Sequence, residues 1–114
     1  MRKYLGNYVD IYLPKFDERL SQQSPDFVAQ TKAKIANLTE DPYHHTKLMK
    51  AQYRGKREAR INDSDRIVFV ICEECGESGF RKYNQCSDCG DTPKNTLLMV
   101  NLILGHDFKG KTRW

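Results

Sequence analysis

Long apolar runs are missing from this 114-residue sequence, whose mean hydropathy is −0.74. The apolar runs present are far shorter than the roughly 20 residues that a helix needs to cross a bilayer. The first thirteen residues also lack an apolar stretch of signal-peptide length. We therefore expect a soluble, cytoplasmic protein without membrane contact. A chain of this length is expected to form one domain, residues 1–114, with a single core.

Cysteine is scarce, and the four present all lie between residues 72 and 89. In a reducing compartment, clustered thiols are more often metal ligands than disulfides. Two C-x-x-C units direct four thiolates at one point, which is typical of a tetrahedral structural zinc site. We predict one Zn²⁺ per chain, and the alternatives are two disulfides, a redox-active pair or an iron–sulfur site. The predicted ligands are Cys72, Cys75, Cys86 and Cys89.

The segment that carries the cysteines, residues 72–94, lies between two strongly apolar runs. It is too polar to join a core by hydrophobic burial alone. Zinc binding, worth about 10 to 16 kcal/mol, can fold what burial cannot. We therefore predict a zinc-ribbon-like hairpin inserted between the last two strands of the domain.

The rest of the chain shows strand and helix periodicity in a recognisable order. Ser24 is a suitable N-cap and Pro25 a suitable first helical residue. The predicted order of elements is strand, helix, helix, strand, strand, insertion, strand. The predicted strands are residues 8–13, 56–62, 66–71 and 95–105, and the predicted helices are residues 15–22 and 25–39.

The net charge of +4 is concentrated in two segments. Residues 43–66 hold seven basic and three acidic side chains, and the last ten residues hold three basic and one acidic. If the fold brings the two segments together, they form a groove suited to phosphates. A solvated basic face is the alternative interpretation.

Three stretches outside the cysteine segment resemble known sequences. They are SPDFVAQTKAKIANLTEDPYH, KLMKAQYRGKREARINDSDRIVFVI and LLMVNLILGH. In their order and spacing they resemble the RelE/ParE superfamily of toxins from type II toxin–antitoxin systems. The fold that this resemblance implies is α+β, with two N-terminal helices packed on a small, twisted, mainly antiparallel sheet.

The resemblance also implies a function. RelE-like members cleave messenger RNA on the ribosome, through attack of the RNA 2′-hydroxyl on the adjacent phosphate. ParE-like members instead inhibit a protein target, DNA gyrase. A third possibility is a nucleic-acid or protein-binding module that keeps the fold without catalysis. A toxin of either kind implies a cognate antitoxin, with an acidic, amphipathic segment that covers the basic groove.

Residue roles follow from the same resemblance. Arg66 matches the arginine that contacts the scissile phosphate, Arg60 matches a second basic position, and His106 is the proton-transfer candidate. His44 and His45 lie near the place where some relatives have a carboxylate base. The side chains expected to hold the RNA backbone are Lys47, Lys50, Arg54, Lys56 and Arg57.

The sequence departs from the family pattern after His106. Many ribonuclease members have a tyrosine a few residues beyond the G-H pair, whereas this chain reads DFKGK there. Phe108 can stack on a base, but it has no proton to donate. The acid role therefore falls on His106 or on a lysine.

Overall fold

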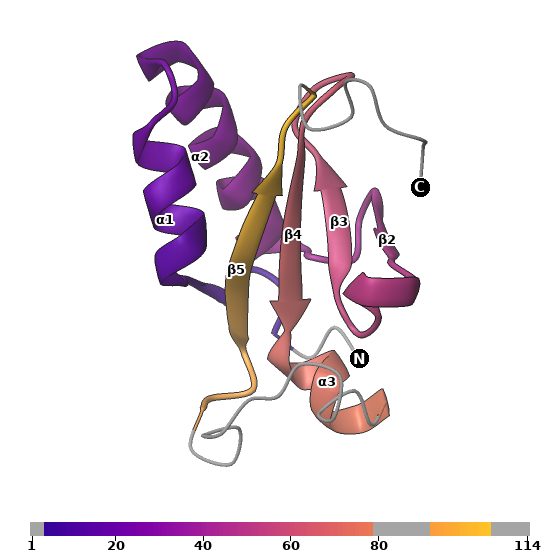
Figure 1. The fold of residues 1–114 in the computed structure, drawn as a ribbon. Helices are drawn as coiled ribbons and strands as arrows, with labels where there is room; N and C mark the ends of the chain where they lie inside the picture. The colour runs from indigo at the N-terminus through magenta and orange to yellow at the C-terminus, as the bar shows by residue number, and fades with distance from the viewer. Residues whose placement is uncertain (1–3, 79–91, 106–114) are drawn as a thin grey trace.

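The computed structural model describes residues 4–78 and 92–105 of the chain. Its centre is a five-stranded sheet with the strand order β1-β5-β4-β3-β2, flanked by helices (Figure 1). This confirms the α+β class. The strands are β1 (Val9–Tyr12), β2 (Thr46–Leu48), β3 (Arg57–Arg60), β4 (Arg66–Ile71) and β5 (Thr96–Ile103). The helices are α1 (Pro14–Ser21), α2 (Pro25–Glu40), the 3₁₀ turn η1 (Ala51–Tyr53) and α3 (Cys72–Ser78).

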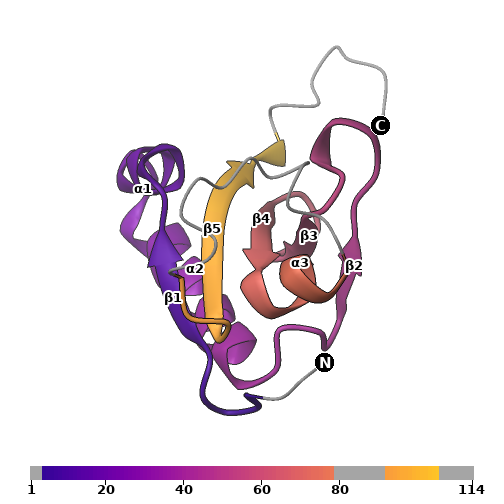
Figure 2. The same ribbon diagram turned by 90° about the horizontal axis from the view of Figure 1, so that it is seen from below.

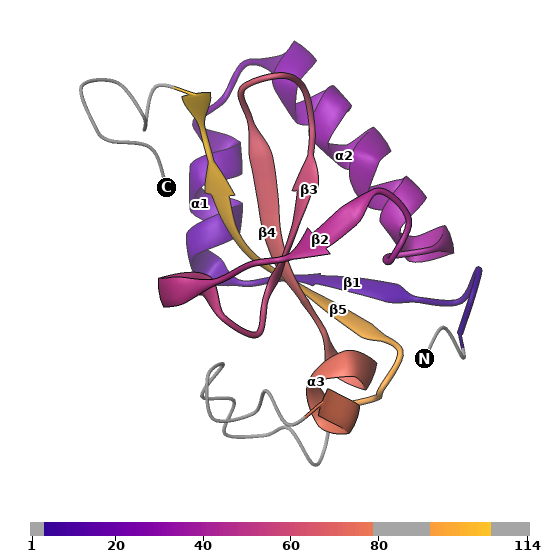
Figure 3. The same cartoon turned by 90° about the vertical axis from the view of Figure 1, so that its right-hand side faces the viewer.

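The sheet is mixed. β1 pairs in parallel with β5, and the pairs β5–β4, β4–β3 and β3–β2 are antiparallel. A register shift between Val68 and Phe69 interrupts the pairing of β4 with β5. The strands twist strongly, so that β2 crosses in front of β3 and β4 when viewed from the β2 edge (Figure 3). The sheet is thus mainly antiparallel and twisted, as expected.

The helices α1 and α2 lie on the same side of the sheet (Figures 1 and 2). The helix α2 begins where the sequence predicts, because the Ser24 side chain accepts a hydrogen bond from the Phe27 backbone N–H and Pro25 takes the first helical position. None of the described helices has the length and hydropathy needed to cross a membrane.

Apolar side chains from both helices and from one face of the sheet form the main core. The strands contribute alternate residues, which is the pattern of a sheet with one covered face. Phe16 and Phe69 are the largest side chains that are completely buried. The core members are Tyr8, Phe16, Leu20, Ile35, Leu38, Ala59, Ile67, Phe69, Ile71, Leu97, Met99, Leu102 and Leu104.

The other face of the sheet carries the polar residues of β2, β3 and the start of β4. In the register, Lys47 pairs with Glu58, and Arg60 pairs with Arg66. Paired residues on neighbouring strands project from the same face of a sheet. Charged residues that are far apart in the sequence therefore lie side by side, and they form the candidate site.

The strand β2 and the turn η1 were not predicted. Both lie in the polar, basic stretch, where three residues of strand give too short an alternation to recognise. The strand forms because it pairs with β3. This pairing depends on the tertiary structure, and the residues of the strand alone do not indicate it. The turn η1 begins at Ala51, which has a positive φ of 56°.

The cysteine segment begins with the helix α3, where the sequence predicts a zinc-ribbon-like hairpin. Cys72 and Cys75 are both buried in this helix. The two residues between them, Glu73 and Glu74, are also buried. The start of the segment is therefore part of the folded domain. The remaining two predicted ligands, Cys86 and Cys89, lie outside the described residues.

Polar contacts attach α3 to the domain. The Tyr8 and Tyr43 hydroxyl groups donate hydrogen bonds to the same Glu73 oxygen, at 2.7 and 2.9 Å. Arg57 binds Glu74 through Nε and Nη2, and its guanidinium lies over the Tyr43 ring. Buried carboxylates are tolerated only when they are paired or hydrogen-bonded in this way. These contacts place α3 at the end of β4 (Figure 1).

Candidate nucleic-acid interface

Two adjoining hollows lie over β2, β3 and the start of β4. The first has a volume of about 590 Å³ and the second about 540 Å³. Three lining residues, Lys47, Glu58 and Arg66, belong to both. These three side chains therefore form the boundary between the hollows, which we call the ridge.

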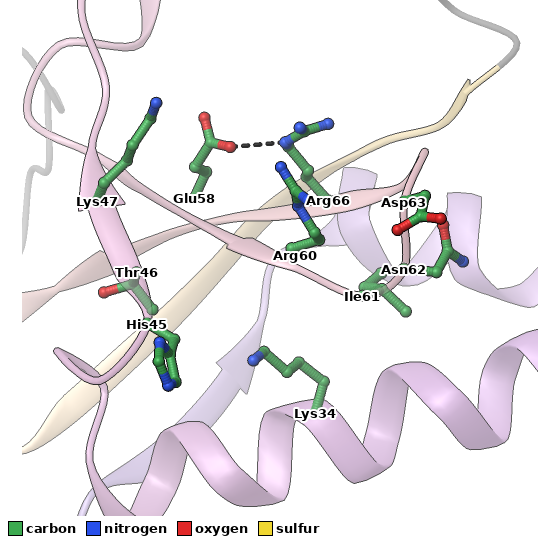
Figure 4. A pocket seen from close by; sticks show the side chains of 10 residues that line it. All are labelled: Lys34, His45, Thr46, Lys47, Glu58, Arg60, Ile61, Asn62, Asp63 and Arg66. Atoms are coloured by element: carbon green, nitrogen blue, oxygen red, sulfur yellow. Dashed lines mark hydrogen bonds and ion pairs between the residues drawn. The ribbon is translucent and has the colours of Figure 1, made fainter.

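The first hollow is lined mainly by cationic and polar side chains. Lys34 reaches it from α2, so that it approaches from another element than the strand residues (Figure 4). The lining residues are Lys34, His45, Thr46, Lys47, Glu58, Arg60, Ile61, Asn62, Asp63 and Arg66. Five of these ten can carry a positive charge, against two carboxylates, so the hollow favours an anionic ligand.

The second hollow is more apolar. Besides the ridge, it is lined by Leu48, Met49, Lys50 and Ala51. Leu48 is 41% exposed, whereas Met49 is buried in a small cluster with Val68 and Ile103. An apolar wall beside a cationic one is the combination that accepts a nucleobase next to its phosphate.

Arg66 and Glu58 form an ion pair on the ridge. The Arg66 Nε lies 2.6 Å from the Glu58 Oε2, and only 17% and 13% of the two side chains are exposed (Figure 4). Arg60 is directly opposite Arg66 in the register, where two like charges repel each other. Glu58 offsets this repulsion. Among the described residues, no hydrogen bond or ion pair engages the Arg60 guanidinium.

A strained residue adjoins the first hollow. His45, which lines it, has a φ of 56°, in a region that non-glycine residues seldom occupy. Its ring meets that of His44 edge to face, with the centroids 3.9 Å apart. Such strain persists only where the surrounding structure imposes it, and it is concentrated at functional sites. Of the two histidines, His45 lines the hollow.

The structure brings several predicted site residues together. Arg60, Arg66 and Lys47 line the first hollow, and Lys50 lines the second. Other predicted residues lie elsewhere. Arg57 projects from the opposite face of β3 and binds Glu74, and neither hollow is lined by Arg54 or Lys56. His106 lies outside the described residues.

Several lining residues were not assigned to the site from sequence, among them Lys34 and Glu58. Lys34 lies opposite the apolar stripe of α2, and on an amphipathic helix this position predicts a side chain that faces water. Glu58 was counted only as a counter-charge in a basic segment. A signal for Glu58 was present, since in a strand it shares a face with Arg60, two residues further on. No comparable signal exists for Lys34, which reaches the site only through the packing of α2.

The turn between β3 and β4 holds the end of β5. The Gly105 backbone N–H donates to Asp65 Oδ1 at 2.7 Å, and the Asn62 side chain donates to Asp65 Oδ2 at 2.8 Å. A Cβ on Gly105 would lie 2.6 Å from the Ser64 Cβ, so glycine is required for this close approach. Asn62 also lines the first hollow. The chain therefore leaves β5 beside the candidate site.

The sequence matches no protein-family model, and no curated protein matches it either. The fold, however, matches solved structures. One is a chain of the toxin–antitoxin complex RelBE2 from Mycobacterium tuberculosis, with a TM-score of 0.58 and 14% identity over 86% of this chain and 98% of that chain. Another is from a YoeB–YefM complex of Staphylococcus aureus, with a TM-score of 0.57 and 12% identity over 85% of this chain and 95% of that chain. The protein therefore shares the fold of chains from toxin–antitoxin complexes.

Two of the four predicted metal ligands, Cys72 and Cys75, lie in the described part of the chain. Cys72 and Cys75 are three residues apart in α3, a spacing that places side chains on one helix face, and neither forms a disulfide. This arrangement fits two ligands of one tetrahedral site. Within residues 4–78 and 92–105, no group of three or more potential ligands gathers.

Proposed function

We propose that this protein is the toxin of a type II toxin–antitoxin system and cleaves messenger RNA on the ribosome. The observation that carries the proposal is the ridge, where Arg66 lies beside a carboxylate at the junction of a cationic and a more apolar hollow. The shared fold with chains from RelBE2 and YoeB–YefM complexes supports it.

The chemistry needs few groups. The 2′-oxygen attacks the adjacent phosphorus, the bond from phosphorus to the 5′-oxygen breaks, and the products are a 2′,3′-cyclic phosphate and a 5′-hydroxyl. Arg66 and Arg60 stabilise the negative charge of the phosphorane, because a guanidinium donates several hydrogen bonds to phosphate oxygens. His106 protonates the leaving 5′-oxygen. Lys47 and Lys50 hold flanking phosphates.

An antitoxin is the expected partner. The cationic hollow is open, and a toxin of this kind harms its own cell unless its site is covered. An acidic, amphipathic segment fits by charge, since carboxylates can pair with Arg60 and Lys47 while apolar side chains contact Leu48. In this proposal the toxin acts in the cytoplasm, where ribosomes and messenger RNA are found.

The test is cleavage of a translated message. Purified protein is added to ribosomes stalled on a defined message, and the new 5′ ends are mapped by primer extension. We expect discrete cuts with the parental protein and about a hundredfold or more slower cutting with Arg66→Ala. An intact message, together with loss of gyrase supercoiling activity, would replace this proposal with the ParE-like alternative. An intact message and active gyrase would favour a binding module.

The zinc site is a separate proposal, which rests on the two C-x-x-C units and is supported by the shared helix face of Cys72 and Cys75. When bound, zinc supplies structure and no chemistry, because four protein thiolates leave no open position. Plasma emission analysis of protein prepared without chelators should give one zinc per chain. The double variant Cys72→Ser/Cys75→Ser should bind none. A metal-free parental protein would contradict the proposal.

A further inference from the structure

The ridge contains a carboxylate at the place where the proposed reaction needs a proton acceptor. Glu58 projects from β3 between Lys47 on β2 and Arg66 on β4, and it lines both hollows. Only Oε2 of this carboxylate is bonded to Arg66. Among the described residues, no hydrogen-bond donor contacts Oε1. A paired carboxylate that lines both hollows is thus held next to the predicted phosphate ligand.

We propose that Glu58 is the general base that takes the proton of the attacking 2′-hydroxyl. The inference rests on the proposed function and adds a catalytic residue to it. Glu58 Oε1 accepts the hydroxyl proton as the bond between the 2′-oxygen and phosphorus forms. The bond to the 5′-oxygen then breaks, and that oxygen receives a proton from His106. One proton enters and one leaves the protein, so the step is balanced.

The ion pair with Arg66 fixes the orientation of the Glu58 carboxylate. A guanidinium has five N–H donors in a rigid plane, so one side chain can bind a carboxylate and a phosphate together. With Arg66 Nε on Glu58, the carboxylate is fixed beside the phosphate that the same arginine holds. The 2′-hydroxyl adjoins that phosphate in RNA. Proton acceptor and electrophile are therefore positioned by one residue, which is the arrangement that general base catalysis requires.

The other titratable side chains at the first hollow suit this role less well. Asp63 is exposed at the tip of the β3–β4 turn and is not part of the ridge. His45 lines only the first hollow, whereas Glu58 adjoins both. Lys47 occupies the opposite side of the ridge and carries a positive charge that suits phosphate rather than a hydroxyl proton.

The test is a set of substitutions measured in single-turnover cleavage on programmed ribosomes at saturating protein. Glu58→Gln keeps the size of the side chain, and its amide oxygen can still accept from Arg66 Nε, but it cannot take up a proton at neutral pH. We expect its cleavage rate to fall by roughly a hundredfold or more, the usual scale for a lost general base. Binding to the ribosome should stay at or above the parental affinity, because one negative charge is removed. Glu18→Gln, on α1 across the sheet, makes the same charge change away from the ridge and should cleave at the parental rate.

The variant Glu58→Asp distinguishes the loss of a catalytic base from the loss of folding. It keeps the carboxylate but withdraws it by one methylene, so we expect a folded protein with a rate between those of the parent and Glu58→Gln. Parental rates for folded Glu58→Gln and Glu58→Asp would overturn the assignment of the base while leaving the proposed function intact. A parental protein that leaves the message whole would instead remove the proposed function, and the base assignment with it.

Discussion

Arg57 on β3 and Glu74 in the first turn of α3 form a bidentate ion pair, with N–O distances of 2.9 and 2.7 Å. Only 14% and 4% of the two side chains are exposed. The pair joins the sheet to the start of the cysteine segment, 17 residues further along the chain. A residue that the sequence assigns to RNA binding thus has a structural role in the described part of the chain.

We expect Glu74→Ala to lower the free energy of unfolding by about 3 kcal/mol, because it leaves a largely buried arginine unpaired. Urea unfolding followed by circular dichroism measures the change. The double variant Arg57→Met/Glu74→Leu should recover most of the loss, since no charge is then left without a partner. A loss of less than about 1 kcal/mol, the value of an exposed pair, would contradict a structural role.

The Glu73 contacts predict a loss of stability in alkali. Burial, followed by the hydrogen bond and the negative charge of Glu73, raises the pKa of Tyr8 and of Tyr43 well above the ordinary value of 10.0. The folded state therefore favours the protonated phenols, so their contribution is fully present below about pH 10 and is lost as the pH rises further. The free energy of unfolding should fall more steeply above about pH 10 in the parental protein than in Tyr8→Phe/Tyr43→Phe. Equal slopes would show that these phenols do not couple to folding.

Thr31 on α2 offers a stabilising change. Its side chain is completely buried, and its Oγ1 has no hydrogen-bond partner in the described structure. Thr31→Val replaces this hydroxyl by a methyl group of similar size, so we expect a gain of about 1 kcal/mol. Thr39→Val on the same helix is the control, because the Thr39 hydroxyl donates to the Ala36 carbonyl at 2.7 Å. Thermal unfolding should rank Thr31→Val above the parent and Thr39→Val at or below it. The reverse order would mean that Thr31 has a partner.

A substitution at Gly105 tests the contact between the chain just after β5 and the turn that joins β3 to β4. The variant Gly105→Ala places a Cβ where Ser64 already lies, so we expect a loss of about 1 to 3 kcal/mol from overpacking. Ser64→Gly removes the opposing atom, and within that background Gly105→Ala should cost much less. A double-mutant cycle of unfolding free energies measures the coupling. Additive effects of the two changes would show that the residues do not touch.

Much of the fold is predictable because it depends on local signals. Ser24 and Pro25 define the start of α2, and the apolar runs of β4 and β5 identify two central strands. Segments fixed by distant partners were not predictable. The strand β2 depends on β3, and α3 depends on carboxylates whose partners lie as far as 65 residues away, at Tyr8.

The residues of the candidate site also divide into those that the sequence predicts and those that it does not. Arg60 and Arg66 were identified through the resemblance to the RelE/ParE superfamily, and the structure places them opposite each other on β3 and β4. Glu58 was overlooked because it lies in a run of basic residues, where a single carboxylate is expected only to balance the positive charge of its neighbours. Lys34 joins the hollow only through the packing of α2. The strand alternation that brings Glu58 and Arg60 to the first hollow directs Arg57 to the other face, where it binds Glu74.

Substitutions at Arg66 and Lys50 should separate chemistry from binding. In single-turnover reactions on programmed ribosomes, saturating protein hides a binding defect but not a lost catalytic group. Lys50→Ala should weaken association and its salt dependence, because one phosphate contact is lost, while it leaves the saturated rate near the parental value. Arg66→Ala should lower the saturated rate by about a hundredfold or more, the scale for losing a donor to developing charge. Equal saturated rates for the two variants would show that Arg66 only binds.

The central claim is tested most directly by the fate of ribosome-bound message with the parental protein. We predict cuts within the message in the ribosome, with a 2′,3′-cyclic phosphate at the new 3′ end and a 5′-hydroxyl on the other fragment, and cutting by Arg66→Ala that is slower by about a hundredfold or more. A message that stays intact at saturating, folded parental protein would contradict it.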